Sequence, residues 1–430
     1  MNTEHIYKIF KDSAGIATDS RKVSDNQLFF ALWGENFNGN KYAADALSKG
    51  ACCAVIDDPQ YESEKTFLVD DCLAELQALA LHHRKQLNIP VIAITGTNGK
   101  TTTKELLAAI LAKKYKVHFT KGNLNNHIGV PLTILSASVD TQIMIVEMGA
   151  NHIGEIKALC HVAEPDYGLI TNIGTAHIEG FGSFEGVVKA KTELYEYLRK
   201  VNGVALYNDK DALITEKIFK YVNRAVPFSD PTGTLLTLEQ EPSDIKLLLK
   251  ASYNHKDYTI NTNLFGKYNY WNVKAAMAVG LFFEVAMEDI TASIEQYSPS
   301  NNRSQVKLTE KNTLICDSYN ANPSSMSNAL QSFASIPSKP KLAILGDMLE
   351  LGASSEEEHK KLVDTLINSR VDKAILVGKT FSKVYDGKAY KTFNNSEDLC
   401  EYLKENPVKG YNILVKGSRG IGLEKIYDLL

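Results

Sequence analysis

The chain has 430 residues, of which 44% are hydrophobic and 23% charged, the composition of a folded globular protein with room for two to four domains at roughly 150 residues each. Its formal net charge is −4 without a dense Lys/Arg run, which argues against nucleic acid or an anionic membrane as main partner. The amino terminus lacks a secretory-signal pattern, no apolar run approaches the ~18 residues of a membrane span, and the six cysteines form no disulfide framework or CxxC zinc site, so we expect a cytoplasmic monomer without membrane insertion.

Short apolar runs rich in β-branched residues alternate with helical patterns, as in βαβ units with mainly parallel sheets. The predicted strands cover residues 91–95, 143–148, 167–174, 203–208, 313–318, 341–347, 373–378 and 412–417. Two polar, loop-like segments, 82–90 and 297–305, interrupt this alternation. We therefore predict an α/β protein of three domains, at 1–84, 85–299 and 300–430.

The segment VIAITGTNGKTTTKELL (91–107) places an apolar strand, a glycine-bracketed turn and a helix start in the order that a phosphate-binding loop requires. Gly96 and Gly99 let backbone N–H groups turn toward an anion. Lys100 can reach the β- and γ-phosphates of a nucleotide, Thr101 can ligate Mg²⁺, and a helix beginning near Thr102 points its positive end at the phosphates. The common spacing would need glycine where Ile94 stands, so this loop is two residues tighter. The expected nucleotide contacts here are Gly96, Thr97, Asn98, Gly99, Lys100, Thr101 and Thr102.

Polar residues follow the next two predicted strands. Glu147 ends the strand at 143–148, and a carboxylate at the carboxyl end of a parallel strand beside such a loop suits Mg²⁺. His177 follows the strand at 167–174, where a lone histidine is more often structural than a ligand. The segment 120–133 carries Asn123, Asn125 and Asn126, which would either donate to a polar substrate or simply form a turn.

The segment FEGVVKAKTELYEYL (184–198) is predicted to be a helix with an apolar face made of Phe184, Val187, Val188, Leu194, Tyr195 and Leu198. Lys191 falls within that face, whereas Lys189 lies roughly 200° around the helix and points elsewhere. Burial would lower the pKa of the Lys191 amine, and the neutral amine is the form that reacts with CO₂ to give a carbamate suited to Mg²⁺. The alternative is a Lys191 ammonium that reaches solvent along the apolar surface.

Taken together, these stretches resemble the Mur ligases of peptidoglycan synthesis, and the similarity covers the whole chain. The motifs that carry it are TGTNGKTTTK (95–104), GNLNNHIGVPLT (122–133), EMGANHIGEI (147–156), NIGTAHIEGFGS (172–183), KAKTELY (189–195), DSYNANPSSM (317–326), LGDMLELG (345–352), VKGSRG (415–420) and, near the amino end, TDSRKVSDNQLFFALWGENFNGNKY (18–42). The phosphate loop alone is shared with folylpolyglutamate synthases. The stretches EMGANHIGEI, DSYNANPSSM and LGDMLELG narrow the resemblance to the members that add a dipeptide.

The resemblance implies an ATP-dependent ligase that joins D-alanyl-D-alanine to UDP-N-acetylmuramoyl-tripeptide through an acyl phosphate. It implies a small mixed α/β domain at 1–84 for the UDP-sugar, a P-loop ATPase-like domain at 85–299, and a Rossmann-like domain at 300–430 that closes over ATP and binds the dipeptide. Two Mg²⁺ ions are expected, one held by Thr101 and Glu147, the other held or oriented by His177 and a carbamylated Lys191, with Lys100 completing the catalytic set.

The resemblance also assigns further contacts. Nucleotide contacts outside the loop fall at Asn269, Asn272, Arg303 and Asp317. Substrate contacts fall at Ser20, Arg21, Asn38, Asn40, Asn123, Asn125, Asn126, Tyr319, Asn320, Asn322, Lys416, Ser418 and Arg419. Tyr268 stands where relatives usually carry histidine. For Arg21, whose forked donors match a pyrophosphate, a surface ion pair is the alternative.

Three alternatives remain open from the sequence. One is a sister ligase that adds the third residue, although its usual DNPR signature is absent from the chain. The second is a folylpolyglutamate synthase, and the third is a nucleotide-switched binding protein that uses the same loop without catalysis. The sequence leaves undecided whether the third residue of the acceptor peptide is lysine or diaminopimelate.

Overall fold

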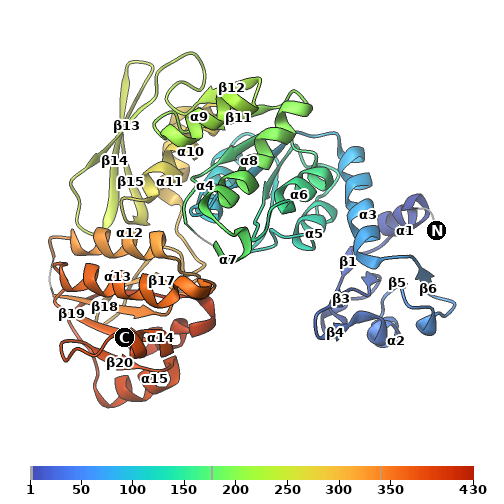
Figure 1. Cartoon of the computed structure of the whole chain (residues 1–430). Helices are drawn as coiled ribbons and strands as arrows, with labels where there is room; N and C mark the ends of the chain where they lie inside the picture. Colours follow the sequence, from blue (N-terminus) through green and yellow to red (C-terminus); the bar gives the residue numbers. More distant parts are fainter. Residues whose placement is uncertain (1–2, 176–177, 339) are drawn as a thin grey trace.

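The computed structural model describes residues 3–175, 178–338 and 340–430. In Figure 1 the chain forms three groups of elements in sequence order, blue, cyan to green, and orange to red, and the two termini lie at opposite ends of the molecule. His177, predicted to be a metal ligand, lies outside the described residues. The α/β class and the three-part architecture predicted from the sequence are confirmed.

The amino-terminal part is a small parallel sheet in the order β1-β2-β5-β6, with helices beside it. Its elements are α1 (Thr3–Asp12), β1 (Ile16–Ala17), β2 (Leu28–Phe30), the hairpin of β3 (Trp33–Gly34) and β4 (Phe37–Asn38), α2 (Ala43–Ser48), β5 (Cys53–Ile56), β6 (Thr66–Leu68) and α3 (Cys72–Leu87). Asp71 caps α3 by accepting from the Ala74 amide. The segment 82–90, predicted to be loop-like, is largely the second half of α3, because His83 and Arg84 are buried against the central sheet's helices.

The central part is a parallel sheet in the order β12-β11-β10-β7-β9-β8. Its strands are β7 (Val91–Thr95), β8 (Val117–Phe119), β9 (Ile143–Glu147), β10 (Tyr167–Ile170), β11 (Val204–Tyr207) and β12 (Arg224–Pro227). Its helices are α4 (Lys100–Leu111), α5 (Gly129–Leu135), α6 (Glu155–Ala163), α7 (Ile178–Phe181), α8 (Phe184–Lys200), α9 (Ala212–Tyr221), α10 (Asn269–Phe282) and α11 (Met287–Gln296). Because β7 pairs with both β9 and β10, the carboxyl ends of these strands meet at one edge, which is where ligands bind in such sheets.

The carboxy-terminal part continues from an antiparallel meander into a parallel sheet, in the order β13-β14-β15-β16-β17-β21-β18-β19-β20. The strands are β13 (Thr237–Glu241), β14 (Lys246–Tyr253), β15 (Lys256–Phe265), β16 (Gln305–Leu308), β17 (Thr313–Asp317), β18 (Lys341–Gly346), β19 (Lys373–Val377), β20 (Lys391–Phe393) and β21 (Asn412–Lys416). The helices are α12 (Pro323–Ala334), α13 (Ser355–Ile367), α14 (Lys379–Val384) and α15 (Ser396–Glu405). The meander meets the parallel strands through the pair Leu264 and Gln305.

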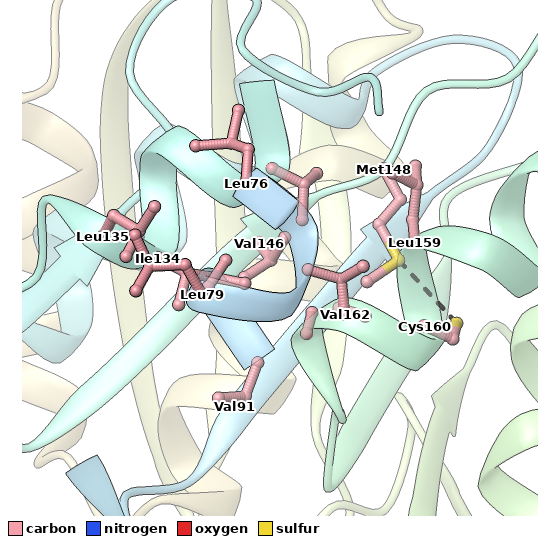
Figure 2. Close-up of a cluster of buried hydrophobic side chains, with 14 of the residues drawn as sticks. Leu76, Leu79, Val91, Ile134, Leu135, Val146, Met148, Leu159, Cys160 and Val162 are labelled. Atoms are coloured by element: carbon pink, nitrogen blue, oxygen red, sulfur yellow. Dashed lines mark hydrogen bonds between the residues drawn. The ribbon is translucent and has the colours of Figure 1, made fainter. Parts of the chain in front are cut away.

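One hydrophobic core runs without a break from the amino-terminal sheet into the central sheet. Figure 2 shows Leu76 and Leu79 of α3 packed among Ile134 of α5, Val146 of β9 and Leu159 of α6, all of them buried. The carboxy-terminal parallel sheet has its own apolar clusters on its two faces. Among the described helices, none combines the length and apolar character that crossing a membrane would require.

Candidate active site

A cleft of about 1320 Å³ opens at the carboxyl edge of the central sheet and is closed on its far side by the carboxy-terminal part. It brings together most of the residues singled out from the sequence. Those that line it are Gly96, Thr97, Asn98, Gly99, Lys100, Thr101, Thr102, Asn123, Asn125, Asn126, Glu147, Lys191, Asn269, Asn272, Arg303, Asp317, Tyr319, Asn320, Asn322 and Lys416.

The loop between β7 and α4 has the backbone that a phosphate-binding turn needs. Gly96 and Gly99 adopt φ angles of +142° and +81°, and a Cβ atom on Gly99 would lie 2.2 Å from Oδ1 of Asn272. The Lys100 ammonium folds back to donate to the carbonyls of Gly96 (2.7 Å) and Thr97 (3.1 Å). Burial lowers the pKa of Lys100 to about 8, an effect that nearby Glu147 opposes and Arg303 reinforces. The loop therefore presents a cation and the amino end of α4, which begins at Lys100, to the cleft.

Glu147 lies at the end of β9 with its side chain almost completely buried. Its Oε1 accepts from Thr101 (3.2 Å) and from Nδ2 of Asn125 (2.7 Å). Its Oε2 has no hydrogen-bond partner within the described residues and lies 3.5 Å from the Nζ of buried Lys104. A buried carboxylate oxygen without a hydrogen bond, beside a threonine hydroxyl, fits the oxygen ligands that Mg²⁺ prefers.

The helix predicted at 184–198 is confirmed as α8, and Lys191 is 3% exposed on its inner face. Lys189 is exposed, as predicted, whereas Phe184, assigned to the apolar face, is 37% exposed because it is the first residue of the helix. Burial, together with the charge of Lys100, lowers the pKa of Lys191 to about 7, against the opposite influence of Glu155 and Glu193. The nearest aromatic contact of its Nζ is the Phe181 ring, 5.4 Å to the centroid. At neutral pH a large fraction of this amine is therefore uncharged and nucleophilic.

The described residues contain no group of three His, Cys, Asp or Glu side chains able to hold a metal. Beside the phosphate loop, Glu147 offers an ionic oxygen next to the hydroxyl of Thr101, and the carboxylate of Glu155 also lines the cleft. A carbamate on Lys191 would add further carboxylate-like oxygens to this part of the cleft.

Asn269 and Asn272 lie at the start of α10 and are bonded within the protein. Asn269 donates to the carbonyl of Phe265 (2.7 Å) and accepts from Nδ2 of Asn272 (2.8 Å), whose Oδ1 accepts from Thr103 (3.3 Å). Both are buried at the cleft wall. They hold α10 against α4.

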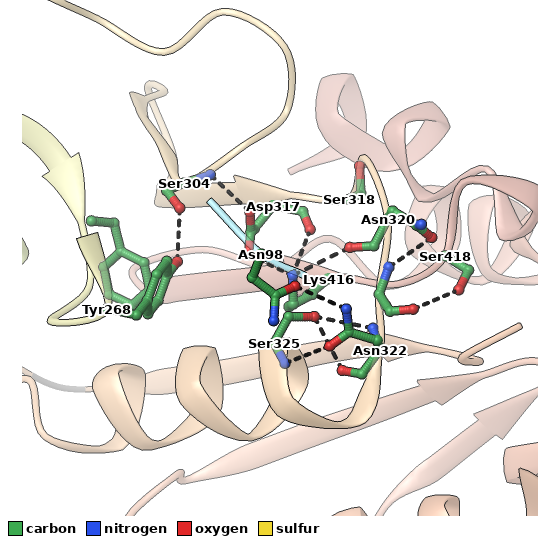
Figure 3. A network of polar contacts seen from close by, with 12 residues as sticks. Asn98, Tyr268, Ser304, Asp317, Ser318, Asn320, Asn322, Ser325, Lys416 and Ser418 are labelled. Atoms are coloured by element: carbon green, nitrogen blue, oxygen red, sulfur yellow. Dashed lines mark hydrogen bonds and ion pairs between the residues drawn. The ribbon is translucent and has the colours of Figure 1, made fainter. Parts of the chain in front are cut away.

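A chain of polar contacts links this wall to the carboxy-terminal sheet (Figure 3). The Tyr268 hydroxyl is 2.8 Å from that of Ser304, and the Ser304 amide donates to Oδ1 of Asp317 (2.8 Å). Oδ2 of Asp317 accepts from the ammonium of Lys416 at 2.7 Å, in a buried ion pair. Lys416 also reaches toward the carbonyl of Asn320 (3.4 Å). Asp317 and Lys416 thus neutralise each other at the cleft floor, where two parallel strands end side by side.

The phosphate loop itself touches the carboxy-terminal part. Nδ2 of Asn98 donates to Ser324 (2.9 Å), and Oδ1 of Asn98 accepts from Nδ2 of Asn322 (2.9 Å). Asn322 is the N-cap of α12, where it also accepts from the Ser325 amide in a capping box. The amino end of α12 therefore faces the phosphate loop across the cleft (Figure 3).

Some predicted residues stand away from the cleft. Arg21 is highly exposed and paired with Asp19 through two hydrogen bonds of 2.9 Å, which is the surface ion pair considered as its alternative. Ser20 is buried beneath it. Asn38 caps the turn at Asn40, whose side chain is fully buried and bonded to Asn38 and Asp57. Asn40 therefore shapes the turn and presents no polar atom to a ligand.

Ser418 and Arg419 follow β21. The Ser418 hydroxyl is buried between the Leu349 amide and the carbonyl of Ala321, so it joins three loops. Arg419 is exposed, with its guanidinium 5.5 Å from the Tyr319 ring that also stacks on Arg303.

Sequence reasoning missed three residues that complete the site. Lys104 supplies the cation beside Glu147, Asn172 accepts from the Asn98 amide (3.0 Å) and donates to its carbonyl (2.9 Å), and Ser324 meets the loop from α12. A helical projection from Lys100 would have placed Lys104 one turn on, facing the same way. Nothing in the sequence pairs Ser324 with a loop more than two hundred residues earlier.

A phosphate loop on a parallel sheet, a buried carboxylate and lysine beside it, and a separate Rossmann-like sheet facing the loop define a three-part ATP-dependent ligase that forms amide bonds. Three family models match in succession: the Mur ligase family catalytic domain over residues 13–115, the Mur ligase middle domain over 94–280, and the Mur ligase glutamate ligase domain over 302–419. The chain belongs to the Mur ligase family.

Individual relatives narrow the comparison. The UDP-N-acetylmuramoyl-tripeptide–D-alanyl-D-alanine ligase of Bacillus subtilis is 36% identical over 431 residues, covering 96% of this chain and 92% of that protein. The crystal structure of MurF from Acinetobacter baumannii superposes with a TM-score of 0.86 at 31% identity, covering 96% of this chain and 92% of its own. The MurF ligase of Thermotoga maritima in complex with ADP gives a TM-score of 0.85 at 25% identity, covering 98% and 97%.

Proposed function

We propose that this chain is the ligase that adds D-alanyl-D-alanine to UDP-N-acetylmuramoyl-tripeptide with hydrolysis of ATP to ADP and phosphate. The observation that carries the proposal is a single cleft that holds the phosphate loop, Glu147, Lys191 and the carboxy-terminal Asn320–Asn322 loop together, in a chain whose full-length relatives bear that name. The product is the UDP-muramoyl-pentapeptide, a precursor of peptidoglycan.

The chemistry follows from the weakness of a carboxylate as an acyl donor. The tripeptide carboxylate attacks the γ-phosphorus of ATP, ADP leaves, and an acyl phosphate forms. The amine of D-alanyl-D-alanine then attacks the acyl carbon, phosphate leaves with the acyl–oxygen bond pair, and the amine loses a proton. Charge spreads over phosphoryl oxygens throughout, so the protein acts by positioning and by cationic stabilisation.

Individual residues then take defined roles. Lys100 exchanges its carbonyl partners for phosphate oxygens, and the amino end of α4 faces the same group. Arg303 lies at the nucleotide side with its guanidinium on Tyr319. The Asp317–Lys416 pair and Asn320 shape the floor where the incoming amine meets the acyl phosphate.

Two Mg²⁺ ions complete the proposal and would neutralise phosphate charge. Thr101 and Glu147 would hold one, consistent with the Oε2 of Glu147, which accepts no hydrogen bond among the described residues and lies beside the ammonium of Lys104. A carbamylated Lys191 would hold or orient the second, together with His177. Asn125 fixes the Glu147 carboxylate from the other side.

The remaining assignments follow the same proposal. The part before residue 85 would bind the UDP-sugar near Arg21 and Asn38, with Ser20 buried beneath Arg21, and Arg21 would leave Asp19 to contact a pyrophosphate. The residues from 300 on would close over ATP and receive the dipeptide near Arg419. The enzyme would act as a monomer in the cytoplasm, where ATP is available.

The deciding experiment measures phosphate release with UDP-muramoyl-tripeptide and ATP, with and without D-alanyl-D-alanine. Release that depends on the dipeptide is expected; release with a single diamino acid or with glutamate and a folate instead would identify a sister ligase or a folylpolyglutamate synthase. Nucleotide binding without any turnover would instead support the alternative of a nucleotide-switched binding protein. Lysine- and diaminopimelate-containing tripeptides are tested side by side to settle the third residue.

The catalytic assignments are tested in the same assay. Lys100→Ala is expected to lose activity by several orders of magnitude, since a desolvated cation on transferring phosphate is worth several kcal/mol. Lys191→Ala is expected to be nearly inactive and partly restored by acetate, with Lys189→Ala, the exposed neighbour, as the matched control. Isotopic oxygen placed in the tripeptide carboxylate is expected in the released phosphate; its absence would exclude the acyl phosphate.

A further inference from the structure

The linker that joins the central part to the carboxy-terminal sheet is tied to the helix of the phosphate loop. It leaves α11 at Tyr297 and enters β16 at Gln305, between the labelled α11 and the orange strands of Figure 1. The Tyr297 hydroxyl donates to Oε2 of Glu105 at 2.7 Å, and Nδ2 of Asn301 donates to Oε1 at 3.0 Å. Both carboxylate oxygens of one side chain therefore hold two points of the linker.

Glu105 lies in the second turn of α4, the helix whose first turn forms the phosphate loop. Its side chain is 17% exposed, and its nearest cation, Lys104, is 3.9 Å away and lies closer to Glu147. Since the linker residues are its direct hydrogen-bond partners, Glu105 attaches the linker to the same rigid element that carries Lys100 and Thr101.

Arg303 follows Asn301 by two residues and lines the cleft. Its guanidinium carbon lies 3.7 Å from the centre of the Tyr319 ring, and its Nε has no hydrogen-bond partner among the described residues. A guanidinium that rests on an aromatic face keeps its N–H donors available for an anion. Only Asn302 separates Arg303 from Asn301, so the hydrogen bond that anchors Asn301 also limits where Arg303 can lie.

We propose that Glu105 is a positioning residue that fixes the interdomain linker on the phosphate-loop helix and thereby holds Arg303, stacked on Tyr319, toward the phosphates of the bound nucleotide. The inference rests on the proposed function, because it gives Arg303 an ATP phosphate as its partner. Glu105 itself contacts no substrate and acts through the linker.

The test measures ADP and ATP affinity by direct titration, without the peptide substrates. Glu105→Ala is expected to weaken nucleotide binding about tenfold, equivalent to about 1.4 kcal/mol. Glu105→Gln keeps an acceptor and is expected to retain most of the affinity. Glu284→Ala removes an exposed carboxylate that pairs with Lys114 beyond the other end of α4 and is expected to change nothing. In turnover, the KM for ATP is expected to rise while the KM for D-alanyl-D-alanine stays unchanged.

A double-mutant cycle with Arg303 separates positioning from general destabilisation. In an Arg303→Ala background, Glu105→Ala is expected to have no further effect on affinity. Independent, additive effects, or unchanged affinity in Glu105→Ala, overturn the proposal. If Glu105→Ala fails to fold, Tyr297→Phe and Asn301→Ala each remove one of the two hydrogen bonds and must show the same coupling to Arg303. The nucleotide affinities are measured without the peptide substrates, so the result of the double-mutant cycle does not depend on whether the protein forms an amide. Conversely, an absence of coupling would overturn the role of Glu105 and leave the proposed ligase activity untouched.

Discussion

Helix α3 joins the amino-terminal sheet to the central sheet through buried apolar side chains, whereas the carboxy-terminal sheet meets the phosphate loop through amides and hydroxyls. On the first side Leu76 and Leu79 enter one core with residues of α5 and α6 (Figure 2). On the second side Asn98 contacts Asn322 (Figure 3), and it also donates to Ser324.

The charged side chains at the two junctions also differ in how deeply they are buried. Buried Arg84 of α3 donates to the carbonyls of Ala163 and Glu164 at the end of α6 and to Asp166, so it closes the carboxyl end of that helix. At the second junction the linker is held by the partly exposed Glu105.

The difference has a physical consequence. Separating apolar surfaces in water costs free energy in proportion to their area, so the amino-terminal junction resists opening. Amide and hydroxyl contacts exchange for water at a net cost of about 1 kcal/mol each, so the contact between the phosphate loop and α12 opens more easily and can re-form around a nucleotide. The meander strands β13–β15 stay joined to α4 and α10 through a shared apolar core. We therefore expect the cleft between the phosphate loop and α12 to open and close as nucleotide is exchanged.

The largest effect is expected from Leu79→Ala at the apolar junction. Leu79 is fully buried in the shared core, and its truncation is expected to lower the free energy of unfolding by about 2–5 kcal/mol. Urea denaturation followed by circular dichroism measures this. Leu308→Ala, at a leucine that is 79% exposed, is the control and should be nearly neutral. An equal loss of unfolding free energy in the two variants would show that packing around Leu79 does not stabilise the junction.

Arg84→Met is expected to cost about 2 kcal/mol, because it leaves the carbonyls of Ala163 and Glu164 without their donor at a buried helix end. Hydrogen exchange in α3 and α6 should speed up in parallel. Lys85→Met removes the neighbouring exposed pair with Glu164 and should cost under about 1 kcal/mol. A larger cost at Lys85 than at Arg84 would contradict the assignment of Arg84 as the residue that locks the junction.

Asn98→Ala is expected to lower stability by no more than about 1 kcal/mol while it opens the cleft. Small-angle scattering should give a larger radius of gyration without nucleotide, and ATP turnover should fall. Ser324→Ala removes one of the two contacts and should show a smaller change in the same direction. A loss of stability comparable with that of Leu79→Ala would erase the distinction between the two junctions.

The smallest effect concerns acid stability and His83. This buried residue lies 3.2 Å from the Tyr7 hydroxyl and 3.3 Å from the Ala137 carbonyl, between α1 and the central part. Burial lowers its pKa below 6.5, with His82 and His118 contributing and the Ala137 carbonyl opposing. The unfolded chain therefore binds the proton more readily, and stability should fall as pH drops below 6.5. In His83→Gln this acid-dependent loss should be reduced, measured as the unfolding midpoint between pH 7 and pH 5; an unchanged pH dependence would exclude His83 as its source.

All eight strands predicted from apolar runs are present, because each is buried on both faces of a parallel sheet and needs an uninterrupted apolar stretch. The buried parallel strand β5 escaped prediction although it is of the same type, and other strands that escaped it differ in type or length. In β15 buried and exposed residues alternate, as on an antiparallel sheet with one solvated face, and β1 and β2 are too short to show a period.

For the candidate site, the sequence named Lys100, Thr101, Glu147 and Lys191 correctly as neighbours, since a loop, a strand end and a helix face are local patterns. The resemblance assigned Asn40 to the substrate, and in the structure the side chain of Asn40 is hydrogen-bonded to Asn38 and Asp57. Sequence reasoning missed Glu105, because nothing local distinguishes a helical glutamate bonded to a distant linker from one in solvent.

What the sequence by itself determined is the local chemistry: the phosphate loop, the buried strands, the inward-facing Lys191, and through its motifs the Mur ligase family. These follow from short-range sterics and from hydrophobic periodicity, which a linear pattern records. The tertiary structure alone decided that the phosphate loop meets α12 through polar contacts, that Asn98 contacts the cap of α12, and that Glu105 holds the linker beside Arg303. Those pairings join residues nearly two hundred or more positions apart, and their energies depend on burial and direction, which exist only once the chain has folded.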